Sequence, residues 1–148
     1  MTIRPIETRD SEAWRRLFHA YGVFYETEFD DAVLDRVWKL LHDESSGIHA
    51  LVTERDGVVV GFAHHRAHFD TFTGGRDWYL EDLYVDPDAR GGGIATALIE
   101  HLAALARDTD HAGTLRWITA ADNVRAQRIY DRLATRTTWV TYEKRLEP

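Results

Sequence analysis

Three consecutive glycines, Gly91 to Gly93, stand between an apolar run that ends at Val85 and a predicted helix. Glycine has no Cβ, so its backbone can come close to a ligand. The first N–H groups of a helix lack partners inside the helix, and the helix dipole favours negative charge at that end. Together these features predict a turn that binds a pyrophosphate, and Arg90 can add a charge-assisted hydrogen bond.

Two common phosphate-binding patterns do not fit this turn. The P-loop requires a lysine directly after its last glycine, but Gly93 is followed by isoleucine. The dinucleotide pattern Gly-x-Gly-x-x-Gly/Ala, counted from Gly91, reaches Thr96 at its last position. Two other interpretations stay open: a nucleotide-dependent enzyme that uses the turn differently, and a turn that only lets the strand and the helix pack closely.

A second group of candidate residues lies on a helix predicted over residues 123–134. Asn123 and Tyr130 are seven residues apart, about two helical turns, so they share one face with Ala126 between them. There is a structural alternative for both. Asn123 can be only the N-cap of the helix, and Tyr130 only a buried aromatic residue.

The pattern Arg-x-x-Gly-x-Ala over residues 90–95, after Leu-Tyr-Val-Asp-Pro over residues 83–87, resembles the coenzyme A signature of the GNAT superfamily of N-acetyltransferases. The resemblance covers nearly the whole chain and is most specific over residues 80–95 and 123–130. It implies an enzyme that uses acetyl-CoA as co-substrate. The residues expected to contact the coenzyme are Leu83, Tyr84, Val85, Arg90, Gly91, Gly92, Gly93, Ile94, Ala95, Thr96, Asn123, Ala126 and Tyr130.

The resemblance also implies roles for these residues. In that family the asparagine, here Asn123, holds the pantetheine arm, and the tyrosine, here Tyr130, protonates the departing thiolate. A tyrosine hydroxyl has a reference pKa of about 10 and can serve a thiolate whose thiol has a pKa of about 8.5. The backbone of residues 83–85 is expected to pair with the pantetheine and to polarise the acetyl carbonyl.

Glu81 is the candidate residue on the acceptor side. A primary amine has a pKa of about 10, so a general base, direct or through water, must remove a proton before the amine attacks. Glu81 and Asp82 are neighbours on a predicted strand, and alternation predicts that only one of them faces the cleft. The run Leu80–Val85 is similar to a strand of the spermidine/spermine N-acetyltransferases, where the glutamate lies beside the amine. Glu81 is therefore the preferred base or amine-orienting group.

The expected acceptor is a polyamine, a diamine or another small cationic amine. Tyr25 and Glu26 are similar to a Tyr-Glu pair that lines the polyamine channel in that subfamily, and the acidic loop after them would attract a cation. The tail over residues 134–142, with Ala134 where many members have glycine, looks more like the branch of histone, polyamine and amino-acid acetyltransferases. Protein or histone lysines, amino acids, and a non-catalytic acyl-CoA sensor stay open as alternatives.

Hydrophobic periodicity predicts the elements that position these residues. Strands are expected at residues 2–7, 48–54, 58–69, 78–85, 115–119 and 138–145, and helices at about 10–25, from about 30, from the glycines to about 105, and at 123–134. Asp56-Gly57 stands between the second and third of these strands and predicts a hairpin. This order predicts an α/β (α+β) protein with a mixed, mostly antiparallel sheet of six to seven strands and helices on both faces. The resemblance implies the same GNAT fold.

Composition narrows the function further. The 148 residues fit one domain, and the absence of cysteine excludes disulfides, thiolate metal sites and a cysteine nucleophile. Acyl transfer must then go directly to the acceptor or through another nucleophile. The net charge of −7 argues against a nucleic-acid partner. We expect no membrane span and a cytoplasmic location, because no long apolar run, signal or transit segment is present.

Eight histidines do not predict a metal site. His64 and His68 share one strand face but lie about 13 Å apart, too far for one ion. A substrate contact or a role as base for one histidine of this strand is an alternative. An exposed Trp139 on the last predicted strand would indicate a dimer contact, and we expect a homodimer.

Overall fold

The computed structural model describes residues 1–147, which form two compact units. The first unit, Met1–Trp117, contains a β-sheet and three α-helices. The second unit, from Ile118 onward, contains one α-helix in its described part, α4 (Val124–Leu133). The single domain expected over residues 1–148 stays a prediction.

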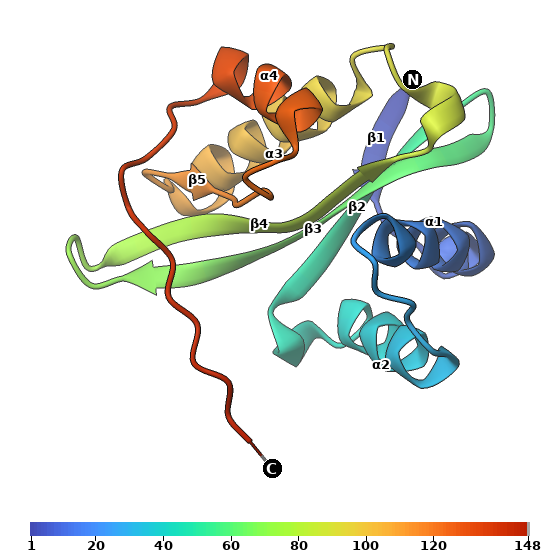
Figure 1. Ribbon diagram of the computed structural model, residues 1–148, viewed down its shortest axis with the longest axis horizontal. Helices are drawn as coiled ribbons and strands as arrows, with labels where there is room; N and C mark the ends of the chain where they lie inside the picture. Colours follow the sequence, from blue (N-terminus) through green and yellow to red (C-terminus); the bar gives the residue numbers. More distant parts are fainter. Residues whose placement is uncertain (148) are drawn as a thin grey trace. The chain divides into compact units, whose positions relative to one another are not determined.

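One mixed sheet forms the centre of the first unit, in the order β1-β2-β3-β4-β5 (Figure 1). The neighbours from β1 to β4 are antiparallel, and β5 is parallel to β4. The predicted fold class is confirmed, but within residues 1–147 the sheet has five strands instead of six or seven. The strands are β1 (Thr2–Pro5), β2 (Ile48–Arg55), β3 (Val58–Asp70), β4 (Gly75–Val85) and β5 (Leu115–Arg116).

A tight turn at Asp56-Gly57 joins β2 to β3. Both turn residues have positive φ angles, 54° and 78°, as a type I′ turn requires. The strand residues on either side, Arg55 and Val58, pair directly across the turn. The hairpin predicted from the Asp-Gly pair is confirmed.

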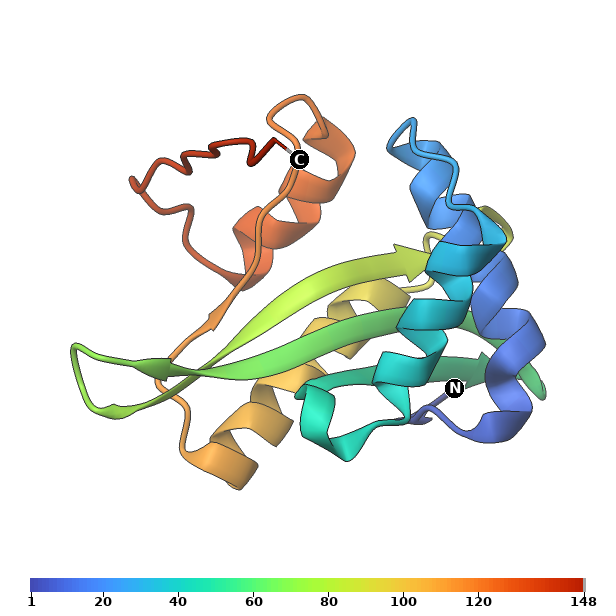
Figure 2. The ribbon, with the colours of Figure 1, turned by 90° about the horizontal axis from the view of Figure 1, so that it is seen from below.

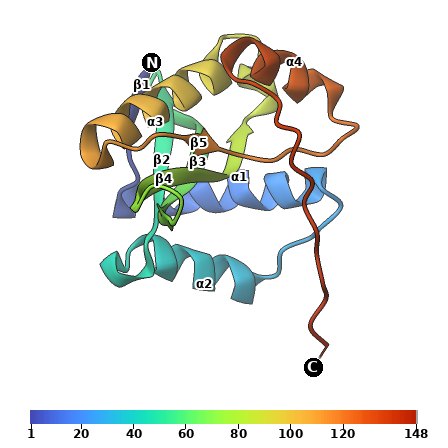
Figure 3. The ribbon, with the colours of Figure 1, turned by 90° about the vertical axis from the view of Figure 1, so that its left-hand side faces the viewer.

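Helices cover both faces of this sheet, as predicted. α1 (Ser11–Phe24) and α2 (Asp31–Leu41) lie on one face, and α3 (Ile94–Asp110) lies on the other (Figures 2 and 3). The apolar stripe of α3 explains its position, since Leu98 and Leu102 have no exposed surface. Within residues 1–147 no helix is long and apolar enough to cross a membrane.

Aromatic side chains fill the core between α1 and the sheet. The Trp14 ring lies 5.3 Å from the Phe18 ring and 5.2 Å from the Trp38 ring, centroid to centroid. Phe18 meets Phe62 of β3 edge-on at 5.8 Å. Aromatic pairs in such geometries stabilise a core beyond the burial of their area. This packing fixes the register of α1 against β3.

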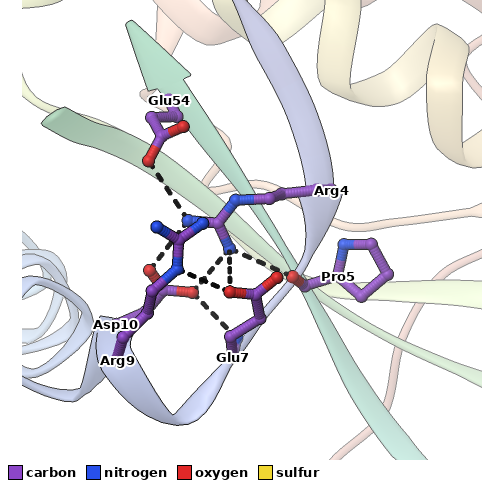
Figure 4. Close-up of polar contacts among 6 residues, drawn as sticks. All are labelled: Arg4, Pro5, Glu7, Arg9, Asp10 and Glu54. Carbon is purple, nitrogen blue, oxygen red and sulfur yellow. Dashed lines mark hydrogen bonds and ion pairs between the residues drawn. The ribbon is translucent and has the colours of Figure 1, made fainter. Parts of the chain in front are cut away.

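An ion-pair network attaches the start of α1 to the sheet (Figure 4). The Arg4 guanidinium on β1 donates to both carboxylate oxygens of Asp10, at 2.7 and 2.9 Å, and to Glu54 on β2 at 3.3 Å. Asp10 is buried and also accepts from the backbone N–H of Glu7 at 2.8 Å. The hydrogen bonds from Arg4 lower the pKa of Asp10, against an opposing contribution from burial.

The strand predicted over residues 138–145 is wrong. In the described part of the second unit, residues 135–147 form neither helix nor strand. The apolar side chains of the segment are solvent-exposed, with 81% exposure for Trp139 and 92% for Tyr142. Alternation shows that a segment is suited to a strand, but a strand also needs a backbone partner. Similarly, the predicted strand 115–119 is reduced to Leu115–Arg116, the two residues that pair with β4.

Candidate active site

The glycine turn connects β4 to α3 through a short 3-10 helix, Pro87–Ala89 (Figure 1). Gly91 and Gly93 have φ angles of 88° and 77°, in the left-handed region that favours glycine. A Cβ added at either residue would meet no protein atom within 4 Å. Backbone conformation and the open space in front of it therefore account for these glycines, whereas close packing of strand against helix does not.

The N-terminus of α3 is open at this turn. Gly93 is the N-cap and provides no side-chain hydrogen bond, and the first helical bond that leaves the turn runs from Ala97 N–H to the Gly93 carbonyl at 2.9 Å. The N–H groups of Ile94, Ala95 and Thr96 precede that bond. Such groups, together with the helix dipole, suit a phosphate.

Two arginines lie at the turn, and the sequence pointed to only one of them. Arg90 is held in place, because its Nε donates to the Val85 carbonyl at 3.1 Å and its guanidinium lies 5.4 Å from the centre of the Tyr84 ring. Arg55, at the end of β2, places Nη1 3.6 Å from the position that a Gly92 Cβ would occupy. The Asp56-Gly57 pair predicted the hairpin. It did not predict that Arg55, the last residue of β2, reaches the glycine turn.

β4 carries a β-bulge at Glu81. His64 of β3 pairs with Asp82, and the next residue, His65, pairs with Leu80, so Glu81 is the extra residue on β4. The prediction that Glu81 and Asp82 point to opposite faces of the sheet is wrong. A bulge sets two residues against one on the partner strand and interrupts the alternation of side chains.

Contacts of the two carboxylates confirm that they share a face. Glu81 forms an ion pair with Arg66, and Asp82 contacts His64 at 2.9 Å. Arg66 and His64 are two residues apart on β3 and therefore lie on the same face. Trp14 of α1 reaches His64 at 2.9 Å, so this is the face that α1 and α2 cover. Adjacent carboxylates that the sequence assigned to opposite faces are thus brought together.

Leu83, Tyr84 and Val85 form the last part of β4, between the bulge and the glycine turn. They pair with Ala63, Phe62 and Gly61 of β3, respectively. On the other side of β4, β5 pairs only with Trp78 and Tyr79. Within residues 1–117, the outer edge of Leu83–Val85 therefore has no strand neighbour. An extended amide-containing chain such as pantetheine can hydrogen-bond to an edge of this kind.

Tyr25 is the C-cap of α1, and Glu26 follows it, so both lie at the end of the helix as predicted. The Tyr25 ring lies 5.0 Å from both Tyr21 and Phe24, and Glu26 has a left-handed φ of 58°. Gly22 explains how the chain reverses here, because a Cβ at this position would lie 2.5 Å from the Thr27 carbonyl oxygen. The acidic loop is therefore folded back on the end of α1.

Asn123, Ala126 and Tyr130 lie on α4, in the second unit. The Asn123 side chain accepts from the backbone N–H of Ala126 at 3.3 Å, so it caps the helix. The three residues share one helical face at the predicted spacing and are half-buried. The structure thus groups these three with each other and, separately, groups Glu81, Asp82 and the glycine turn in the first unit.

The histidines of β3 lie in different surroundings. His64 is 1% exposed and hydrogen-bonded on both ring nitrogens. His65 stacks on Trp78 at 5.0 Å on the opposite face, and burial lowers its pKa to about 3. Among the described residues no group of three side chains is arranged to hold a metal ion.

Comparisons with known proteins agree on one family. The profile of the Acetyltransferase (GNAT) family matches residues 12–134. The chain is 32% identical to a D-amino-acid N-acetyltransferase of Saccharomyces cerevisiae over 149 aligned residues, 97% of this chain and 90% of the relative. It is 36% identical over 98 residues to a thialysine N-epsilon-acetyltransferase of Bos taurus, covering 61% and 56% of the two chains. Among solved structures, a ribosomal-protein-alanine N-acetyltransferase from Brucella melitensis biovar Abortus 2308 matches with a TM-score of 0.83, 26% identity and 98% of each chain covered.

Proposed function

The chain belongs to the acetyltransferase (GNAT) family, and from that premise we propose that it transfers an acetyl group from acetyl-CoA directly to the primary amine of a small cationic molecule. The observation that carries the proposal is the geometry of β4. One strand holds two carboxylates at a bulge, then three residues with an open outer edge, and then leads into the glycine turn.

The coenzyme fits the second half of this arrangement. The open N-terminus of α3 suits the pyrophosphate of acetyl-CoA, and Arg90 and Arg55 add positive charge beside it. The edge of Leu83–Val85 suits the two amides of the pantetheine arm. Asn123 and Ala126 of α4 are proposed to hold the same arm. Acetyl-CoA is a co-substrate in this scheme and leaves as coenzyme A.

The acceptor is proposed to be a polyamine, a diamine or a related small amine that carries a second polar group. The yeast relative is named for D-amino acids and the bovine relative for thialysine, both small amines. Tyr25 and Glu26 are proposed to form the rim that receives the acceptor. Glu81 is proposed to orient the amine, because it lies at the bulge of β4, on the face of the sheet that α1 covers.

The chemistry follows from these positions. An ammonium group loses a proton, and the amine nitrogen attacks the thioester carbonyl and forms a C–N bond. Backbone N–H groups of Leu83–Val85 stabilise the oxyanion. The C–S bond then breaks, and the sulfur, which keeps the electron pair, takes a proton from Tyr130. The nitrogen loses its second proton as the amide forms, and this proton restores the Tyr130 hydroxyl, so the net products are amide, free thiol and one proton.

A thiol-release assay tests the proposal. Acetyl-CoA is offered with polyamines, L- and D-amino acids, thialysine and basic peptides, and we expect release of free thiol with the small amines. Activity only on peptides would contradict the small-amine acceptor. If no acceptor releases thiol although acetyl-CoA raises the melting temperature, the sensor alternative is correct. NAD and ATP serve as controls, since stabilisation by either instead of acetyl-CoA would favour a nucleotide-dependent enzyme.

A further inference from the structure

We propose that Asp82, the second carboxylate of the bulge, receives the acceptor's ammonium group and takes its proton, and that His64 and Trp14 hold Asp82 in position. This inference rests on the proposed acetyl transfer to an amine. It assigns Asp82 as a catalytic residue and assigns His64 and Trp14 as positioning residues.

A hydrogen-bonded chain leads from the core to Asp82. Trp14 Nε1 on α1 donates to His64 Nε2 on β3 at 2.9 Å, and His64 Nδ1 lies 2.9 Å from Asp82 Oδ2 on β4. Trp14 and His64 are each 1% exposed, whereas the Asp82 side chain is 25% exposed. This row of hydrogen bonds is therefore fixed at its buried end, Trp14, and open to solvent at the Asp82 carboxylate.

The indole ring determines the protonation state of His64. A tryptophan Nε1–H can only donate, so His64 Nε2 must be unprotonated in order to accept it. The proton of the neutral imidazole then resides on Nδ1 and is donated to Asp82. His64 consequently orients the carboxylate without neutralising its charge. Because indole cannot accept a proton, the chain cannot carry protons into the core, and it acts as a support.

Charge distinguishes Asp82 from Glu81. Glu81 forms an ion pair with Arg66, whose guanidinium also lies 4.8 Å from the centre of the Tyr79 ring. Among the described residues, Asp82 pairs only with the neutral His64, which carries no balancing charge. An arriving ammonium group therefore finds the negative charge of Asp82 uncompensated, while that of Glu81 is already balanced.

Position along the strand points the same way. Asp82 directly precedes Leu83, where the open edge proposed for the pantetheine begins. A carboxylate one residue from that edge is close to the end of the arm, where the acetyl group is carried. The proton passes from the ammonium nitrogen to Asp82 and then to solvent, and the neutral amine keeps the lone pair that forms the C–N bond.

Kinetics of matched amide variants test the catalytic part. Asp82→Asn should lower kcat/KM for the amine by about 100-fold or more, the usual effect of losing a general base. Glu81→Gln should cost clearly less and act mainly on the KM of the amine. Asp110→Asn is the control, because Asp110, like Asp82, accepts a hydrogen bond from an aromatic ring nitrogen, Trp78 Nε1 at 2.8 Å, but lies on the other face of the sheet. A larger loss of kcat in Glu81→Gln than in Asp82→Asn would overturn the assignment.

A second pair of variants tests whether His64 holds Asp82 in position. His64→Leu removes both hydrogen bonds and should lower kcat by about 10- to 100-fold while the KM for acetyl-CoA changes little. His64→Gln, which keeps one acceptor and one donor, should recover part of that loss. Equal kcat values in His64→Leu and the unaltered protein would show that His64 has no positioning role.

Nitrogen NMR of the histidine rings provides a measurement that needs no activity. We expect His64 to be a neutral imidazole with its proton on Nδ1. A proton on Nε2 would contradict the positioning role of Trp14 and His64, whether or not the protein transfers acetyl groups. If the unaltered protein releases no thiol with any amine while the His64 spectrum is as expected, the proposed function and the role of Asp82 fail together and the hydrogen-bonded support stands.

Discussion

At the level of single residues, the proposed reaction needs a proton donor for the leaving thiolate, and Tyr130 is assigned this role. Replacing it with phenylalanine removes the hydroxyl and keeps the ring. We expect Tyr130→Phe to lower kcat by about 100-fold or more, with nearly unchanged affinity for acetyl-CoA. Steady-state kinetics and calorimetric titration with acetyl-CoA measure the two effects. An unchanged kcat would exclude Tyr130 as the acid.

Asp10 connects a single carboxylate to the stability of the fold. Its pKa is lowered chiefly by the hydrogen bonds from Arg4. The ion pair therefore stabilises the protein above the ordinary pKa of an aspartate, about 3.9, and this stabilisation is lost as the pH falls through the lowered value. Asp10→Asn should reduce the free energy of unfolding at pH 7 by about 3 kcal/mol, since Arg4 loses its principal buried partner.

Urea unfolding at several pH values checks this prediction. The difference in stability between the unaltered protein and Asp10→Asn should be largest at neutral pH and should shrink below about pH 4. A difference that stays constant down to pH 2 would contradict the role of the Asp10 charge.

At the level of elements, a substitution in the glycine turn can distinguish backbone strain from a loss of acetyl-CoA binding. Gly93→Ala places a Cβ at a left-handed φ of 77°, at a cost of about 1–2 kcal/mol. The Cβ would also stand where a phosphate approaches the helix. We expect a loss of at least about 10-fold in acetyl-CoA affinity, equivalent to one charge-assisted hydrogen bond.

Gly47→Ala is the matched control for the turn. Gly47 has a φ of 75°, and a Cβ there would likewise meet no atom within 4 Å, but it lies before β2. Both variants should lose similar stability in urea unfolding, and only Gly93→Ala should weaken the binding of acetyl-CoA. If the two variants bind acetyl-CoA with equal affinity, the glycine turn does not bind the coenzyme.

The elements also show what can be predicted from this sequence. Val58–Asp70 was predicted to within one residue, because a strong turn signal and a period of two agree with each other. The bulge at Glu81 was not predicted, since register is a property of two strands and adjacent carboxylates show no sign of it. Residues 138–145 were wrongly predicted as a strand for the same reason. Alternating apolar and polar residues show that a segment can form a strand, but they do not show that a partner strand is present.

The candidate site was predictable where it depends on local structure. The positive φ angles of Gly91 and Gly93 and the cap at Asn123 follow from residue type at a helix end. The contacts of Arg55 with the turn and of Trp14 with His64 join residues far apart in the sequence. No spacing rule connects such residues, so only the packed structure identifies them.

At the level of the whole molecule, the expected homodimer stays a prediction that solution mass can test. Trp139 and Tyr142 are almost fully exposed on the described part of the second unit. Contiguous apolar patches on a protein surface mark association sites, and we expect these two side chains to form part of one. We expect light scattering to give twice the mass of the chain, and Trp139→Ser to shift the protein toward the monomer. A monomer at micromolar concentration would contradict this prediction.

The bulge on β4 is equivalent to the insertion of one residue into a regular strand. If Glu81 were deleted, Leu80 and Asp82 would become neighbours and would still pair with His65 and His64, as they do now. Both halves of the strand would keep their core faces, so one added codon can supply this acidic group without repacking the interior. The sheet is therefore open to insertion and deletion at the point where the proposed chemistry is placed, and acceptor preference can change there while the fold stays the same.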